Sequence, residues 1–226
     1  MGKREVDITQ TLGFGMLITM VGGFMDTYSY TVRGEVFATG QTGNFVLVAV
    51  RLMRGELLPM LQALTPILSF WLGVFAAQHL LHRVHKGDDL RWRRNVLGLE
   101  IVLLLLVGLI PADVPHILAN TLISLTAAMQ FCCFRNLGEG AAYATVFCTG
   151  NMRSCAEMYY RGLLLKDKAS LKKAHCYGGI LLSFFLGACL GVGTSALWTE
   201  KSIWCACGIL GVALGVLVWE QRKQKF

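Results

Sequence analysis

The sequence predicts an all-α integral membrane protein with about six transmembrane helices, two re-entrant half-helices and two inverted repeats. Of its 226 residues, 54% are hydrophobic and only 15% are charged, whereas a soluble domain carries about 25% charged residues. Several apolar runs approach or exceed the roughly 20 residues that span a bilayer. A short motif also interrupts one hydrophobic segment in each half of the chain. The apolar runs argue against the alternative, a soluble protein with an unusual core.

The lengths of the apolar runs predict the spanning helices. The first run continues past Gly23 without a small-residue cleavage site, so we expect a retained helix rather than a signal peptide. Polar loops are expected at His82–Asn95 and Lys166–Lys173. The expected helices cover residues 8–30, 58–82, 95–110, 114–134, 175–198 and 202–219.

Two segments, residues 33–54 and 138–161, do not fit this simple count. Each begins with small and polar residues and becomes helix-like only after the tripeptide Thr-Gly-Asn. The helical part has about 11 residues, which at 1.5 Å per residue gives a length of ~16 Å, or half a membrane. We therefore expect each segment to enter the membrane as a re-entrant half-helix.

The tripeptides also reveal an internal repeat. Thr42-Gly43-Asn44 recurs as Thr149-Gly150-Asn151, at an offset of 107 residues. The order of elements is the same in both halves, namely a long helix, a broken segment and two further helices. The chain is therefore interpreted as one membrane domain, 1–226, with a first repeat at 1–110 and a second repeat at 111–226.

The positions of Lys and Arg predict the orientation, because cytoplasmic loops carry an excess of them. If the broken segments spanned fully, eight helices would place the basic loop 83–94 outside. If they are re-entrant, six spans place both basic loops and both termini in the cytoplasm. The second arrangement obeys the rule better. Three spans in each half also make the repeats inverted, as in many channels and transporters.

The Thr-Gly-Asn breaks, Thr42-Gly43-Asn44 and Thr149-Gly150-Asn151, are the first candidate site. A half-helix that begins at mid-membrane directs its free amides and positive dipole end into the protein. Irregular backbone at that depth is tolerated only when protein buries it or when it lines a water-filled cavity. Two such ends predict a site for an anion or a polar neutral solute. A structural kink satisfied by neighbouring helices is the alternative, and the doubling of the motif favours a function.

Two charged residues extend this candidate site. Asp26 lies about two-thirds along the first helix, and an ionisable residue inside the bilayer is a functional candidate by default. It could pair with a cation, carry a coupling proton or bond the Thr-Gly-Asn backbone; its alternative position is the outer interface, beside Tyr28 and Tyr30. Arg153 lies two residues past the second break, so we expect it to face the site. Its spacing from Glu157 also predicts an ion pair.

The remaining motifs indicate helix packing, and the common metal-binding and catalytic motifs are missing from the sequence. Gly187-x-x-x-Gly191 and Gly211-x-x-x-Gly215 are close-packing signals, either within one chain or between chains. The eight cysteines fit no zinc spacing, and no paired-histidine, P-loop or GxSxG motif is present. We therefore expect no catalytic residue, metal, cofactor or nucleic-acid partner. The expected partners are the lipid bilayer and a small polar or anionic solute, with a homo-oligomer left open.

The first broken segment and its approach carry a family resemblance. The stretch GGFMDTYSYTVRGEVFATGQTGNFV resembles the hallmark sequence of the YoaK-type family of bacterial inner-membrane proteins, and AYATVFCTGNM resembles its second motif. The resemblance covers essentially the whole chain. It implies about six helices in a bacterial cytoplasmic membrane and no established substrate. The family often has Gln-Asn where this chain has Gln130-Phe131, so a polar partner for Asp26 from that position is not implied.

Together these features favour a transporter or channel for a small polar or anionic solute, with Asn44 and Asn151 at the waist of its pathway. One alternative is a non-transporting scaffold or accessory protein whose breaks are structural. Another, with less support, is an intramembrane enzyme that uses Asp26. A wetted path between both faces would favour transport, a sealed core would favour the scaffold, and a blind polar pocket holding Asp26 would favour the enzyme.

Overall fold

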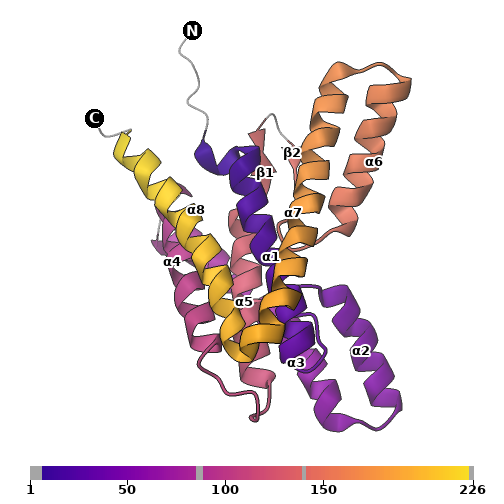
Figure 1. Ribbon diagram of the computed structural model, residues 1–226, viewed down its shortest axis with the longest axis vertical. Helices are drawn as coiled ribbons and strands as arrows, with labels where there is room; N and C mark the ends of the chain where they lie inside the picture. Colours follow the sequence, from indigo (N-terminus) through magenta and orange to yellow (C-terminus); the bar gives the residue numbers. More distant parts are fainter. Residues whose placement is uncertain (1–6, 85–88, 139–140, 224–226) are drawn as a thin grey trace.

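The computed structural model describes residues 7–84, 89–138 and 141–223, and almost all of them lie in helices (Figure 1). The principal helices are α1 (Leu12–Val32), α2 (Gln41–Met53), α3 (Leu57–His79), α4 (Asp89–Val107), α5 (Ile117–Cys133), α6 (Thr149–Leu164), α7 (Lys168–Trp198) and α8 (Trp204–Lys223). The shorter elements are η1 (Ile8–Gln10), η2 (Leu80–Val84), η4 (Thr199–Ile203) and the antiparallel strands β1 (Asn136–Leu137) and β2 (Ala141–Ala142).

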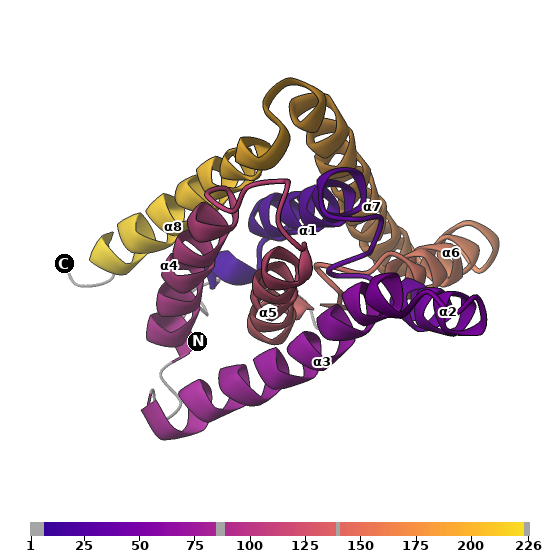
Figure 2. The same ribbon diagram turned by 90° about the horizontal axis from the view of Figure 1, so that it is seen from below.

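Helices α1 and α5 lie at the centre of the bundle, and the other helices surround them (Figure 2). Helix α1 packs along α7, and α5 packs along α3. The repeat pairs α1 with α5, α2 with α6, α3 with α7 and α4 with α8. In agreement with this pairing, α8 contacts α1 and α4 contacts α5, while α6 contacts α7 and α2 contacts α3. Each of these contacts made by a helix of the first half is thus matched by a contact of its counterpart in the second half.

The two broken segments leave the bundle on the same side. From the middle of the molecule α2 runs downward in Figure 1, α6 runs upward, and both chain ends lie at the top. The halves also share one apolar core, which joins side chains of α1, α4, α5 and α8. Its fully buried members include Ile18, Leu97, Ile123 and Leu210.

Glycines let α1 approach its neighbours closely. A Cβ on Gly22 would stand 2.2 Å from the carbonyl oxygen of Thr145, and one on Gly187 would stand 1.9 Å from that of Met20. Helix α1 is therefore in backbone contact with both the second broken segment and α7. By contrast, a Cβ on Gly211 or Gly215 would meet nothing within 4 Å. The first of the two glycine motifs thus packs within the chain, whereas the second lies on an open face of α8.

The helix boundaries correct two expectations about loops. Helix α4 begins at Asp89 rather than at residue 95, and α7 begins at Lys168 rather than at residue 175. At α7 the reason is a cap that sequence reasoning overlooked. The carboxylate of Asp167 accepts hydrogen bonds from the amide of Ala169 at 3.0 Å and the hydroxyl of Ser170 at 2.6 Å, which satisfies free donors at the helix start.

Two stretches of helix in the described part of the chain have the length and composition of membrane spans. Among the described residues, Leu57–Arg83 and the α7–α8 stretch Lys168–Lys223 are long and apolar enough to cross a bilayer, and Ile117–Cys133 is apolar but shorter. Large side chains such as Trp71 and Phe75 lie exposed on the outer surface of α3. Helix α1 contains Asp26 and several glycines, but α1 is surrounded by other helices, so it needs less apolar surface.

The backbone contact at Gly187 predicts a strong packing effect. We expect Gly187→Ala to lower the free energy of unfolding by about 1–3 kcal/mol or more, because the new methyl group meets backbone that cannot rotate away. The measurement is thermal unfolding of the purified protein in detergent. Gly193→Ala, on the same helix with nothing within 4 Å of its Cβ, is the matched control. Equal melting temperatures for the two variants would contradict the packing of α1 on α7.

Candidate functional site

The first broken segment is tied to α1 through Asp26. Its Oδ1 atom accepts hydrogen bonds from the backbone amides of Thr39 at 3.1 Å and Gly40 at 3.2 Å. The expected bond from Asp26 to the Thr-Gly-Asn backbone is therefore displaced: the structure shows it at Thr39 and Gly40, just before that tripeptide. The hydroxyl of Thr39 donates to the carbonyl of Val146 at 3.3 Å, and these two residues are 107 positions apart. This bond joins the two breaks at equivalent positions of the two halves.

Asn44 and Asn151 form the same clamp in the two halves. The Oδ1 atom of Asn44 accepts from the amide of Phe37 at 3.0 Å, and its Nδ2 donates to the carbonyl of the same residue. The Oδ1 atom of Asn151 accepts from the amide of Ala144 at 3.0 Å, and its Nδ2 donates to that residue's carbonyl at 2.7 Å. Each amide thus satisfies both backbone groups of the residue seven positions before it. Neither asparagine is an N-cap, because the caps are Gly40 and Cys148.

A cavity of about 310 Å³, here called the break cavity, lies where the two breaks meet. Four residues predicted for the site line it, namely Asp26, Thr42, Gly43 and Thr149. The remaining lining residues, not singled out as site residues by the sequence, are Phe37, Gly40, Val146, Phe147, Cys148 and Phe184. Since the side chains of Thr42 and Thr149 are exposed, the cavity opens to the surroundings between α2 and α6.

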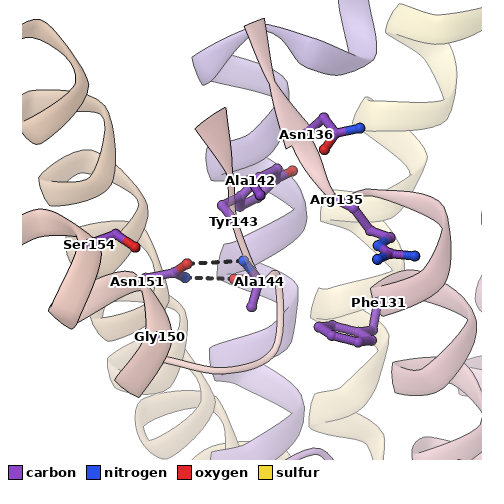
Figure 3. A pocket seen from close by; sticks show the side chains of 9 residues that line it. All are labelled: Phe131, Arg135, Asn136, Ala142, Tyr143, Ala144, Gly150, Asn151 and Ser154. Atoms are coloured by element: carbon purple, nitrogen blue, oxygen red, sulfur yellow. Dashed lines mark hydrogen bonds between the residues drawn. The ribbon is translucent and has the colours of Figure 1, made fainter. Parts of the chain in front are cut away.

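A second cavity of about 320 Å³, here called the hairpin cavity, lies beside the strands (Figure 3). Its lining residues are Phe131, Arg135, Asn136, Ala142, Tyr143, Ala144, Gly150, Asn151 and Ser154. Figure 3 shows Asn151 bonded to Ala144 on one side of it, with Phe131 and Arg135 on the other. Consecutive residues of the second broken segment therefore line both cavities.

Aromatic rings connect the linings of the two cavities. Phe147 lines the break cavity and Phe131 lines the hairpin cavity, and their rings meet edge to face with centroids 5.3 Å apart. Phe70 of α3 contacts both rings, at 6.1 Å from Phe131 and 6.0 Å from Phe147. Three phenylalanines in mutual contact thus connect the linings of the two cavities.

The other predicted site residues lie elsewhere. Asn44 is buried and lines neither cavity, while Gly150 and Asn151 line the hairpin cavity. The ion pair of Arg153 with Glu157 is confirmed at 2.8 Å, but the prediction that Arg153 faces the site is wrong, since its side chain is 80% exposed. The reason is helical geometry, because Asn151 must point inward to hold Ala144, which turns a residue two positions later away.

Arg33 is a buried anchor that the sequence did not single out. Its guanidinium donates to the hydroxyl of Tyr28 at 2.9 Å and to the carbonyls of Val107, Ile110 and Pro111 at 2.8–3.2 Å. Val107 ends α4, so a positive charge here faces the negative end of a helix dipole. The anchor holds the end of α1, and with it the first broken segment, against α4.

The fold and the site define an all-α protein with paired, side-chain-clamped helix breaks and, among the described residues, two helical stretches long and apolar enough to cross a membrane. Over residues 14–216 the chain matches the family described as "Protein of unknown function (DUF1275)", and it belongs to that family. It is 27% identical over 147 residues to the "UPF0700 transmembrane protein YoaK" of Bacillus subtilis (strain 168). The matched region covers 62% of this chain and 64% of that protein, which is less than two thirds of its length. The YoaK-type resemblance is thereby confirmed. No solved structure matches the chain.

The two asparagine clamps predict equal and independent effects on stability. We expect Asn44→Ala and Asn151→Ala each to lower the free energy of unfolding by about 1–3 kcal/mol, because each leaves a backbone N–H and C=O unpaired. The clamps share no residue, so the losses should add in the double variant. Thermal unfolding in detergent measures this, with Thr42→Ala as the control because its hydroxyl is exposed. A clamp variant that melts with the wild type would show that the breaks are held by something else.

Proposed function

We propose that the protein is a non-catalytic transporter or channel for a small polar solute, with its pathway at the crossing of the two breaks. The observation that carries the proposal is the pair of cavities that meet at the second broken segment. Both contain polar groups, and a ring that lines one, Phe147, contacts a ring that lines the other, Phe131. Polar cavities inside a helical membrane protein favour a solute pathway, since burying polar groups without such a use is costly.

We also propose the membrane arrangement expected from the sequence, namely a multi-pass protein of the bacterial cytoplasmic membrane with two inverted repeats and both termini in the cytoplasm. Helices α1, α3, α4, α5, α7 and α8 would span, and α2 and α6 would be half-helices. The opposite directions of α2 and α6, the reciprocal helix contacts and the duplicated asparagine clamp support inversion. The shared side of the two chain ends supports an even number of spans.

The aromatic cluster is proposed as the gate of this pathway. Hydrophobic constrictions close pores by excluding water, and Phe131 and Phe147, one from the lining of each cavity, are in ring contact. The gate would open by rotation of one of these rings. Two functions compete with this proposal. The scaffold draws support from the same clamps, because they satisfy the broken backbone without any solute, and the intramembrane enzyme draws support from Asp26, which lines the break cavity.

Flux through the gate tests the proposed function. Protein in proteoliposomes should pass small polar solutes, screened by isotope uptake or by osmotic swelling, and Phe147→Ala should raise the rate several-fold because the constriction widens. Phe75→Ala is the matched control, since its ring is 68% exposed on α3 and lines neither cavity. No flux in either the wild type or Phe147→Ala, with both proteins folded, would favour the scaffold.

Cysteine labelling in cells tests the proposed arrangement. In a variant that lacks the native cysteines, Lys168→Cys at the start of α7 should react only from the cytoplasm, because that end carries the basic residues. Lys201→Cys, in η4 at the other end of α7, should react with an impermeant thiol reagent added outside. Labelling of both positions from the same side would contradict the spanning of α7, and exchanged sides would invert the orientation.

A further inference from the structure

We propose that the break cavity binds a small solute through an ammonium group, which would rest against Asp26 and the surrounding phenyl rings. The inference rests on the proposed function, because it names the class of solute that the pathway takes. The sequence predicted a polar or anionic solute, whereas the cavity favours a polar solute that carries a positive charge. Three properties of the cavity carry it: a carboxylate oxygen, aromatic walls and the kinds of side chain around them.

The first property is the way Asp26 is held. Both backbone hydrogen bonds, from Thr39 and Gly40, are made to Oδ1. The other oxygen, Oδ2, takes no part in these two bonds, and a Cβ on Gly40 would stand 3.5 Å from it. Because Gly40 and Asp26 both line the cavity, the absence of a side chain at position 40 leaves room beside this oxygen. The hydroxyl of Thr39 also interacts with this carboxylate. Oδ1 is thus structural, while Oδ2 borders the room left by Gly40 and can accept a further hydrogen bond from a solute.

The second property is the aromatic wall. Three phenylalanines, Phe37, Phe147 and Phe184, line the same cavity as the carboxylate. The face of an aromatic ring carries negative charge density and attracts cations within about 6 Å. Phenyl rings around a single carboxylate are therefore suited to an organic ammonium group, whose methylene groups pack on the rings while its N–H groups face the oxygen. They are less suited to a small anion, which would meet the same negative faces.

The third property is the balance of charge around the cavity. None of its described lining residues is Lys, Arg or His, and the nearby Arg153 is exposed and paired with Glu157. The starts of α2 and α6 each carry the equivalent of about half a positive charge, which partly balances the negative charge of Asp26. The residues just before α2, however, already donate to Oδ1. The open start of α6 can accept the electronegative end of a solute whose ammonium group is at Oδ2.

The carboxylate is present on one side of the crossing only. With the repeat offset of 107, position 26 corresponds to 26 + 107 = 133, which is Cys133. The second half therefore supplies no matching acid at that position. The pathway has one charged contact rather than a symmetric pair, and we expect one ammonium group bound per chain.

Cys148 provides a direct test, because its thiol is half-buried and lines the cavity. In a variant that keeps Cys148 as its only cysteine, the thiol is labelled with two methanethiosulfonates of similar size, one carrying trimethylammonium and one carrying sulfonate. The same two rates are measured in a variant whose only cysteine is Lys201→Cys, because Lys201 is exposed in η4 at the end of α7 and outside the cavity. The ratio of the cationic to the anionic labelling rate at Cys148 is divided by the same ratio at the reference cysteine. This corrected ratio no longer contains the intrinsic difference in reactivity between the two reagents.

The account predicts that the cationic reagent is favoured at Cys148 by about tenfold or more after this correction, because a carboxylate lies in the same cavity. Asp26→Asn should bring the corrected ratio close to one. The amide oxygen can still accept from Thr39 and Gly40, so this variant should fold, as checked by its melting temperature. Methylammonium, but not acetate, should slow the labelling of Cys148. This protection is measured with Asp26 intact, so it holds as a test even if Asp26→Asn does not fold.

A corrected ratio near or below one with Asp26 intact, or equal protection by acetate, would overturn the ammonium inference. So would a ratio that Asp26→Asn leaves unchanged. Labelling in detergent needs no flux, so the two proposals can fail separately. Charge selection without flux would keep the ammonium site and remove the transporter, whereas flux without charge selection would keep the transporter and remove the ammonium site.

Discussion

The rest of the structure depends on the need to satisfy the broken backbone inside the membrane. With no water in the hydrocarbon region, each free N–H and C=O must find a partner in the protein. Asn44 and Asn151 supply it at one end of each break, and Asp26 supplies it at Thr39 and Gly40. Such short bonds require α1 to lie against both breaks, which explains why α1 carries glycines where it meets backbone. The motif that interrupts the helices is thus also the motif that holds them.

The same constraint explains why a site remains. Each clamp uses the side-chain amide of its asparagine completely, so the asparagines do not bond the amides of the helix starts. These amides and Oδ2 of Asp26 remain for the cavity between the breaks. The Thr39–Val146 bond fixes the two breaks to each other, and the buried Arg33 fixes the first break to α4. The surrounding backbone is therefore rigid, while the phenylalanine cluster is held only by apolar contacts. A pathway with rigid walls and one movable aromatic constriction is the physical basis of the proposed transport.

The sequence predicted much of this, and its errors have local causes. Apolar length located the principal helices to within several residues, and the repeated tripeptide located both breaks. The start of α7 was predicted too late because a run of lysines obscured the cap made by Asp167. Arg33 and Phe131 could not be assigned from periodicity, because their roles depend on helices far away in the chain. Arg153 was expected at the site because it follows the break by only two residues. Its side chain points away, because Asn151 on the same helix must point inward to form its clamp.

The central claim is that water reaches the crossing of the breaks while the clamped backbone stays protected. Amide hydrogen exchange of the protein in lipid nanodiscs, read by mass spectrometry, measures both properties at once. The account predicts slow exchange at the clamped amides of Phe37 and Ala144 and fast exchange at the first turn of α6, around Thr149 and Gly150. Equal and strong protection of all these amides would mean a sealed crossing and would contradict a solute pathway. Fast exchange at Phe37 and Ala144 would instead contradict the clamps.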